Sequence, residues 1–430
     1  MFFSKDIETA GRERLTALQG EKLKNLIATL YGPNRFYTRK LEAAGVKPED
    51  IQRAEDLGRL PFTFKDELVL DQKENPEFGT NLTFPEKDYV RVHQTSGTGG
   101  QPLRWLDTAE DWDWWGTCWG YVFSGAGVTP GDRVFVAFSF APFIGFWAAV
   151  EGIRKVGAML VPGGGLSTRQ RIQAILDSKS TAVVCTPTYA LRMAEEAREM
   201  GVDLAKADVR VTIHAGEPGA NIPSTKRRIE EAWGAQCIDH TGATEVGAFG
   251  FEDKDRPGGV FLTESEFICE VLDPNGDRPV GPGQEGELVI TNLGRAGMPV
   301  IRYRTGDLVK ISGEPCPTGR TFIWAEGGVL GRADDMFIIR GVNVFPSAIE
   351  NIVREHKEVN EFRIEVETVR EMAELKLCIE CDPGASPDSV VRRLSKEVQG
   401  RLGVRAIISL AEPGSLPRFE LKARRLQKNP

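Results

Sequence analysis

The sequence predicts an α/β protein: a large N-terminal domain with parallel sheets and a small β-rich subdomain, followed by a small α+β C-terminal domain. Strand-like and helix-like segments alternate between residues 128 and 242, which indicates a parallel sheet with helices on both faces. From residue 260 the pattern changes to short β-rich runs separated by turns, as at 273–276. Beyond residue 333, strand patterns around two helical ones predict a second, compact unit.

The first 55 residues are charged and have a helical period. Leu23, Leu26 and Ile27 are spaced to share one apolar face of a helix. Further on, Thr63 is expected to cap a short helix. We therefore expect a peripheral helical layer at this end of the chain.

The segment 107–121 is rich in aromatic residues. Trp112, Trp115 and Trp119 fall on one face of a helix. An aromatic stripe of this kind is typical of a packed core, so we assign it no cofactor.

The uncharged stretch at 134–150 is close to the lower limit of length for a membrane span. It contains Ser139 and Pro142, and its first half is β-like while its second half is helix-like. We therefore expect a buried strand at 134–140 and a helix at 143–156 rather than a span.

The remaining elements follow from the same patterns. Further strands are expected at 158–161, 181–186, 211–215, 237–240, 287–291, 301–303, 360–381 and 405–411. Further helices are expected at 169–177, 189–200, 347–355 and 386–402. In parallel sheets ligands bind beyond the carboxyl ends of the strands, so the loops after 215 and 240 are candidate binding loops.

Composition excludes some classes of function. The chain has 430 residues, 41% of them hydrophobic and 27% charged, as in a globular protein with a real core. The net charge of −8 argues against general nucleic-acid binding, which needs a basic face. Seven scattered cysteines fit free thiols in a reducing compartment, and the N-terminus lacks an apolar signal segment. We therefore expect a cytoplasmic protein that binds neither membrane nor nucleic acid.

A loop rich in hydroxyl groups and glycine follows the strand-like residues 89–92. It consists of Thr95, Ser96, Gly97, Thr98, Gly99 and Gly100. Glycines allow successive backbone N–H groups to face one anion, and the hydroxyls add donors, so the loop suits phosphate. It lacks the lysine of the common P-loop, and an ordinary surface connection is the alternative.

A second candidate loop follows the strand at 237–240. Thr244 and Glu245 offer a hydroxyl and a hard carboxylate, which suit a phosphate and a Mg²⁺ ion. The alternative is a turn with an exposed acid.

Several separated motifs together resemble the adenylate-forming acid ligases. The stretch 331–350, Gly-Arg-Ala-Asp-Asp-Met-Phe-Ile-Ile-Arg-Gly-Val-Asn-Val-Phe-Pro-Ser-Ala-Ile-Glu, is close to the signature of the phenylacetate–CoA ligase branch. The runs at 36–37, 44–50 and 60–63 resemble the same branch. The resemblance covers nearly the whole chain and implies an adenylation domain at 1–332 and a mobile C-terminal domain at 333–430.

The resemblance implies an activity and its cofactors. A carboxylic acid would attack the α-phosphate of ATP to form an acyl-adenylate, and a thiol, usually that of CoA, would then displace AMP. ATP/AMP, Mg²⁺ and CoA are the expected cofactors, and the acid, ATP and CoA the expected partners. An aryl or arylacetic acid such as phenylacetate is the default substrate, and relatives commonly form homodimers.

The resemblance also assigns residues. For the ATP phosphates it implies Thr95, Ser96, Gly97, Thr98, Gly99, Gly100 and Thr244. For adenine it implies Gly216, Glu217, Pro218, Asp239, His240 and Thr241. For the ribose it implies Asp307, assisted by Arg332, and it also assigns Asn343 to cofactor binding. Glu245 would bind Mg²⁺, Lys422 would be the catalytic lysine, Asp334 the hinge, and Gly341 would face the CoA tunnel.

The chain departs from the family pattern at three positions. Gln101 stands where the phosphate loop usually has lysine, Gly99 where it has a second threonine, and Thr241 where an aromatic residue precedes Gly242. These departures predict weaker ATP binding or a changed substrate rather than inactivity.

Three functions remain open from the sequence. The first is an acid–CoA ligase for an aromatic acid. Its pocket would be walled by Phe138, Phe140, Phe143, Ile144 and Phe146, although packing in the buried core is an equal alternative for most of these side chains. The second is an adenylating enzyme that passes its acyl group to a carrier protein or an amine. The third is a nucleotide-binding protein that has lost turnover. Cys378 and Cys381 form a lone Cys-x-x-Cys, which is too little for a zinc site.

Overall fold

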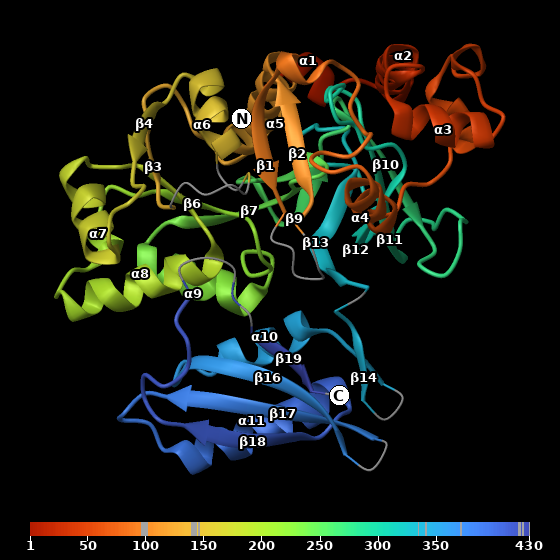
Figure 1. Ribbon diagram of the computed structural model, residues 1–430. Helices are drawn as coiled ribbons and strands as arrows, with labels where there is room; N and C mark the ends of the chain where they lie inside the picture. The colour runs from red at the N-terminus through yellow and green to blue at the C-terminus, as the bar shows by residue number, and fades with distance from the viewer. Residues whose placement is uncertain are drawn as a thin grey trace.

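One long sheet organises the large N-terminal part of the protein (Figure 1). The structure is a computed structural model that describes residues 1–95, 102–138, 144, 147–333, 335–339, 342–369, 372–419, 423 and 425–429. The sheet has 11 strands in the order β10 (Phe267–Leu272), β11 (Glu285–Asn292), β12 (Tyr303–Ile311), β13 (Trp324–Arg332), β9 (Arg256–Leu262), β8 (Gly247–Asp253), β7 (Gln236–Ala243), β6 (Val211–His214), β5 (Ala182–Cys185), β3 (Arg133–Val136) and β4 (Met159–Pro162).

The direction of the strands changes at β7. From β4 to β7 all neighbours are parallel, as the alternating pattern predicts. From β7 to β10 all neighbours are antiparallel, because these strands are joined without intervening helices. The predicted β-rich subdomain therefore forms the antiparallel half of the same sheet.

Helices cover the parallel half of the sheet and the adjoining strand β8, on which α5 packs. They are α5 (Ala109–Gly125), α6 (Trp147–Val156), α7 (Thr168–Asp177), α8 (Pro187–Glu199), the short η4 (Leu204–Lys206) and α9 (Pro223–Trp233). Thr108 caps α5 by accepting the N–H of Asp111, and Thr186 caps α8 by accepting the N–H of Tyr189. The aromatic stripe of α5 is core as expected, with Trp112, Trp115 and Trp119 buried.

The N-terminal helices form a layer beside the antiparallel half (Figure 1). They are α1 (Lys5–Glu8), α2 (Arg12–Leu30), α3 (Arg35–Ala43), η1 (Pro48–Asp50), η2 (Ala54–Arg59), α4 (Lys65–Glu74) and η3 (Glu86–Asp88), followed by the hairpin β1 (Tyr89–Gln94) and β2 (Arg104–Thr108). Leu23, Leu26 and Ile27 are buried on one face of α2, as the spacing predicts.

Several local predictions differ from the structure. The strand expected at 301–303 begins only at Tyr303 and continues to Ile311 as β12. The strand expected at 134–140 is shorter (β3), and the helix expected from 143 begins at Trp147 in α6. Thr63 does not cap α4, whose N-cap is Phe64. Thr63 is instead buried against β12, where tertiary hydrogen bonds override its local capping preference.

The C-terminal part has its own sheet and core. After the hairpin β14 (Phe337–Ile339) and β15 (Val342–Val344), the strands run in the order β18 (Ala406–Ala411), β17 (Met372–Cys381), β16 (Val359–Val369) and β19 (Leu426–Asn429). Helices α10 (Pro346–Glu355) and α11 (Pro387–Leu402) complete this unit, which lies below α8 and α9 in Figure 1. Its hydrophobic cluster draws only on residues beyond position 336.

The seven cysteines are free thiols. None of the helices in the described part of the chain has the length and apolar character that a membrane span requires.

The contact between α5 and α6 depends on a glycine. A Cβ added at Gly152 would lie 2.4 Å from the Cβ of Trp119 and 3.1 Å from the ring of Phe123. We expect Gly152→Ala to lower the free energy of unfolding by about 1–3 kcal/mol, because the helices must move apart. Chemical denaturation measures this loss. Gly400→Ala in α11 is the control: a Cβ there meets no atom within 4 Å, so alanine should stabilise by about 0.5 kcal/mol.

A buried ion-pair network holds β16 to the chain end. Glu361 accepts two hydrogen bonds from Arg425, at 2.7 and 3.1 Å, and one from Arg354, at 3.4 Å. Burial alone would raise the pKa of Glu361, but Arg354 and Arg425 outweigh it and lower the pKa from 4.5 to about 2.

The stabilisation by Glu361 is therefore fully present above pH 4.5 and is lost as the pH falls from 4.5 toward 2. We expect Glu361→Gln to cost about 3 kcal/mol at pH 7, from a pKa difference worth about 1.4 kcal/mol per unit. Urea unfolding of both proteins between pH 3 and pH 7 should show the difference shrinking toward low pH. A constant difference would contradict a charge-based contribution.

Candidate active site

The acidic loop between β7 and β8 is the centre of the site. Glu245 lies there and is 8% exposed. Its Oε1 accepts hydrogen bonds from the ammonium group of Lys65 and from the hydroxyl of Tyr303, each at 3.3 Å. Burial and the Glu245 carboxylate raise the pKa of Tyr303, so its hydroxyl stays protonated and donates. The carboxylate is therefore nearly buried, accepts two hydrogen bonds and lies beside a cation.

Thr63 explains why Lys65 reaches this loop. The N–H of Thr63 donates to the carbonyl of Arg302 at 3.0 Å, and its hydroxyl donates to the carbonyl of Ile301 at 2.7 Å. Arg304 in turn donates its N–H to the Thr63 carbonyl at 3.0 Å. These bonds attach the start of α4 to β12, so Lys65 and Tyr303 approach Glu245 together.

Sequence reasoning assigned Lys65 to a peripheral helical layer and missed its contact with Glu245. The available signal was its place directly after the run 60–63, one of the stretches that carries the family resemblance.

A buried arginine links the acidic loop to the hairpin β1–β2. Arg295 forms an ion pair with Asp107, with Nε 2.7 Å from Oδ1, and both side chains are 0% exposed. Its Nη1 donates to the carbonyl oxygens of Thr244 at 2.8 Å and Glu245 at 3.4 Å. Burial would raise the pKa of Asp107, but Arg295 and His93 lower it, so the pair is charged. Sequence reasoning missed Arg295 and Asp107 altogether.

The glycine-rich loop begins and ends at this hairpin. The N–H of Thr95 donates to the carbonyl of Leu103 at 2.9 Å, and the Thr95 hydroxyl accepts the N–H of Leu103 at 3.0 Å. These bonds close the base of the loop. Ser96, Gly97, Thr98, Gly99, Gly100 and Gln101 lie outside the described residues.

The residues expected to line adenine come together at the carboxyl ends of two parallel neighbours, β6 and β7. Gly216, Glu217 and Pro218 lie in the loop after β6, and Asp239, His240 and Thr241 lie in β7. The adjacency follows from the parallel pairing that the alternating pattern predicts.

Three side chains of β7 have unusual surroundings. Burial and the neighbouring Glu252 raise the pKa of Asp239 to about 7. Burial lowers the pKa of His240 to about 4, so its ring is neutral, and it lies 4.4 Å from the ring of Trp119. The hydroxyl of Thr241 is buried and has no hydrogen-bond partner among the described residues.

Asp307 and Arg332 face each other across paired strands β12 and β13. Arg332 Nη1 donates to Asp307 Oδ1 at 3.3 Å. Asn343 is exposed on β15 of the C-terminal part. Asp334, Gly341 and Lys422 lie outside the described residues, but Ala423, which follows Lys422, donates its N–H to Glu217.

The described residues offer few side chains that could bind a metal ion. Within the described ranges, no three His, Cys, Asp or Glu side chains converge in a way that would hold a metal ion. Glu245 is a single hard carboxylate, and the ammonium group of Lys65 shows that a cation fits beside it. This donor set suits Mg²⁺, which is commonly held by one or two carboxylates together with phosphate oxygens and water.

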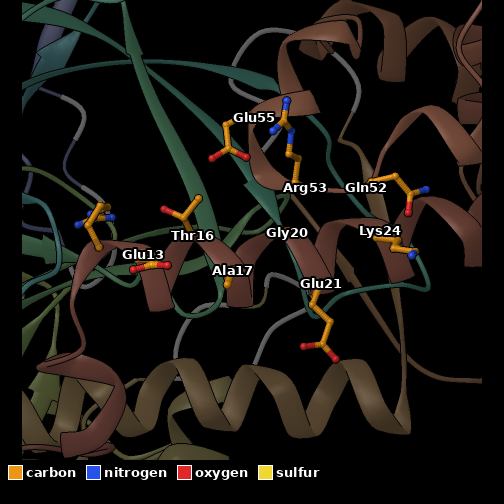
Figure 2. A pocket seen from close by; sticks show the side chains of 10 residues that line it. Glu13, Thr16, Ala17, Gly20, Glu21, Lys24, Gln52, Arg53 and Glu55 are labelled. Carbon is orange, nitrogen blue, oxygen red and sulfur yellow. The ribbon is translucent and has the colours of Figure 1, made fainter.

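A separate open groove runs between α2 and residues 52–55 (Figure 2). It is lined by side chains of both charges, including Glu13, Lys24 and Arg53. It shares no residue with the predicted site, so we assign it no ligand.

Comparison with known proteins identifies the family. The AMP-binding enzyme family model matches residues 39–297, and the AMP-binding enzyme C-terminal domain model matches residues 341–429. Phenylacetate–coenzyme A ligases of Thermus thermophilus and Aromatoleum evansii are 32% and 33% identical to this chain. The first alignment covers 98% of this chain and 97% of the relative, the second 98% and 96%.

A solved structure shares the fold and its arrangement. The chain aligns with 2-hydroxyisobutyryl-CoA ligase in its postadenylation state with a TM-score of 0.94 and 31% identity, covering 100% of this chain and 92% of that one. The same ligase with CoA in its thioesterification state gives a TM-score of 0.75. On these similarities, the chain belongs to the AMP-binding enzyme family, in the phenylacetate–CoA ligase branch.

Proposed function

We propose that this protein is an AMP-forming acid–CoA ligase that acts on an aryl or arylacetic acid. A carboxylate oxygen of the acid attacks the α-phosphorus of ATP and pyrophosphate leaves. The sulfur of CoA then attacks the acyl carbon, AMP leaves, and the thiol proton passes to solvent. The observation that carries the proposal is the nearly buried carboxylate of Glu245, which accepts hydrogen bonds from Lys65 and Tyr303 directly after Thr244.

Different residues would have different roles in the first step, the formation of the acyl-adenylate. Glu245 would hold Mg²⁺, which neutralises charge on the phosphate oxygens when bound. Thr244 and the loop 95–100 would bind phosphate. The backbone of the loop 216–218 and residues 239–241 of β7 would line adenine, and Asp307 with Arg332 would bind the ribose. Lys422 would hold the reacting carboxylate and the α-phosphate together, because two anions otherwise repel.

Lys65 supplies a charge that Gln101 lacks. The family loop usually has lysine at position 101, and its absence removes one cation from the phosphates. The ammonium group of Lys65 lies 3.3 Å from Glu245, and a cation placed there can reach both a bound phosphate and the carboxylate. We therefore assign Lys65 to phosphate binding.

The substrate class rests on the relatives and on apolar side chains. Phe138 and Ile144 are buried at 4% and 5% exposure, while Phe140, Phe143 and Phe146 lie outside the described residues. The phenylacetate–CoA ligases favour an aromatic acid, whereas the 2-hydroxyisobutyryl-CoA ligase is named for a small aliphatic one. Four points stay predictions. They are a carrier protein or amine as acceptor, a homodimer, a cytoplasmic location and the domain boundary at 332/333.

A panel of acids tests the function. We expect pyrophosphate release from ATP and Mg²⁺ to depend on aryl or arylacetic acids, and thioester to form only when CoA is added. 2-Hydroxyisobutyrate and short fatty acids serve as the aliphatic arm. Release without thioester would indicate another acceptor. Nucleotide binding without release for any acid would contradict the ligase function.

A lysine variant tests the phosphate site. We expect Lys65→Ala to raise the KM for ATP about 5-fold, because a half-exposed charge pair contributes about 1 kcal/mol. Steady-state kinetics at saturating acid measures the change. Lys73→Ala, an exposed lysine on the same helix, is the matched control and should leave the KM unchanged. An equal effect of both variants would contradict a specific role for Lys65.

A further inference from the structure

The C-terminal tail meets the large domain at one carboxylate. Glu217 lies in the loop after β6, and its Oε1 accepts the N–H of Thr188 at 3.0 Å. Its Oε2 accepts the N–H of Ala423 in the tail. Thr188 is the second residue of α8, whose first N–H groups have no partner within the helix. Glu217 therefore joins the start of a helix in the large domain to the backbone of the tail.

Arg425 strengthens the same junction. Its side chain is 8% exposed, and its guanidinium forms a two-point ion pair with Glu361 of the C-terminal sheet. Its Nη1 also donates to the hydroxyl of Thr188 at 3.3 Å. Burial raises the pKa of Glu217, and the charge of Arg425 opposes that rise. The tail thus contacts α8 and its neighbouring loop through a backbone N–H and a fixed positive charge.

We propose that Glu217 is a positioning residue that docks the C-terminal tail in the arrangement used for acid adenylation. Both of its carboxylate oxygens accept N–H groups of the protein, so its side chain is committed to the tail and to α8. The inference rests on the proposed function, in which Lys422, the residue before Ala423, serves the adenylation step. Charge-assisted hydrogen bonds to a backbone N–H are strong and directional enough to fix a short segment.

Two other roles for Glu217 make different predictions. A side chain that binds adenine would change the affinity for ATP, whereas a docking side chain would change the rate of adenylation at saturating ATP. A side chain needed only for folding would change both half-reactions and the thermal stability. The two half-reactions are therefore measured separately, together with the dissociation constant for ATP.

The experiment compares Glu217→Ala and Glu217→Gln with the unaltered full-length protein. We expect Glu217→Ala to slow acid-dependent pyrophosphate release about 10- to 100-fold at saturating ATP, as for loss of a charged hydrogen bond. Thioester formation from supplied acyl-adenylate and CoA should stay within about 2-fold, as should the dissociation constant for ATP. Glu217→Gln should recover part of the loss, because its amide oxygen can accept one of the two N–H groups.

Two further variants serve as references. Lys422→Ala should show the same split between half-reactions as Glu217→Ala. Glu231→Ala is the matched control, because Glu231 also pairs across the two parts, with Lys357 at 2.7 Å, but both side chains are at least half exposed. It should leave both half-reactions unchanged.

Several outcomes would overturn the assignment. They are an equal loss of both half-reactions in Glu217→Ala, an unchanged adenylation rate, or a loss explained by ATP affinity alone. Unaltered protein that releases no pyrophosphate with any acid would overturn the proposed function and this assignment with it. Normal release by that protein with no split in the variant would overturn the docking role alone.

Discussion

The buried ion pair between Arg295 and Asp107 is the contact on which the candidate site depends most. Removing two charges from water is costly, and further hydrogen bonds to the pair offset part of that cost. Here the indole N–H of Trp115 donates to Asp107, and Arg295 donates to the carbonyl oxygens of Thr244 and Glu245. One guanidinium therefore fixes the acidic loop relative to the hairpin that frames the glycine-rich loop. Its main contribution is geometry, since the site must hold phosphate and carboxylate at a set separation.

Much of the fold could be predicted from local patterns. The alternation of strands and helices between 128 and 242 gives parallel pairing, and parallel pairing brings the loops after β6 and β7 together. The turn-rich pattern after 260 gives antiparallel strands. The local patterns do not predict that the antiparallel strands continue the parallel sheet at β7. That depends on which sheet edge the later strands join.

The long-range contacts of the site could not be predicted from local patterns. Lys65 and Glu245 are 180 residues apart, and nothing in the local sequence of either indicates the other. Threonine often caps a helix, but the hydroxyl of Thr63 instead donates a hydrogen bond to the carbonyl of Ile301, 238 residues away. The family resemblance placed Glu245 and Glu217 in loops near the nucleotide. It did not indicate that Arg295 anchors the first loop or that Ala423 binds the second.

Polar contacts join the two parts of the protein, and this fits the proposal that the C-terminal part moves between the two half-reactions. Among the described residues, no hydrophobic cluster combines residues from both sides of position 333. Hydrogen bonds and ion pairs do cross the junction, such as the hydrogen bonds from Arg228 to the carbonyl oxygens of Lys357 and Val359. Polar interfaces of this kind allow relative motion, whereas a shared apolar core would resist it.

The partners of Glu217 fit the same requirement. If the tail leaves, the carboxylate loses the N–H of Ala423 and the charge of Arg425 but keeps the N–H of Thr188 at the start of α8. The positive end of the helix dipole and that remaining bond stabilise the carboxylate in the undocked state. Arg425 likewise keeps its two-point pair with Glu361, which lies on its own side of the junction. Both charges therefore keep a partner when the tail undocks, and this fits the proposal that the tail docks for one half-reaction and is released for the next.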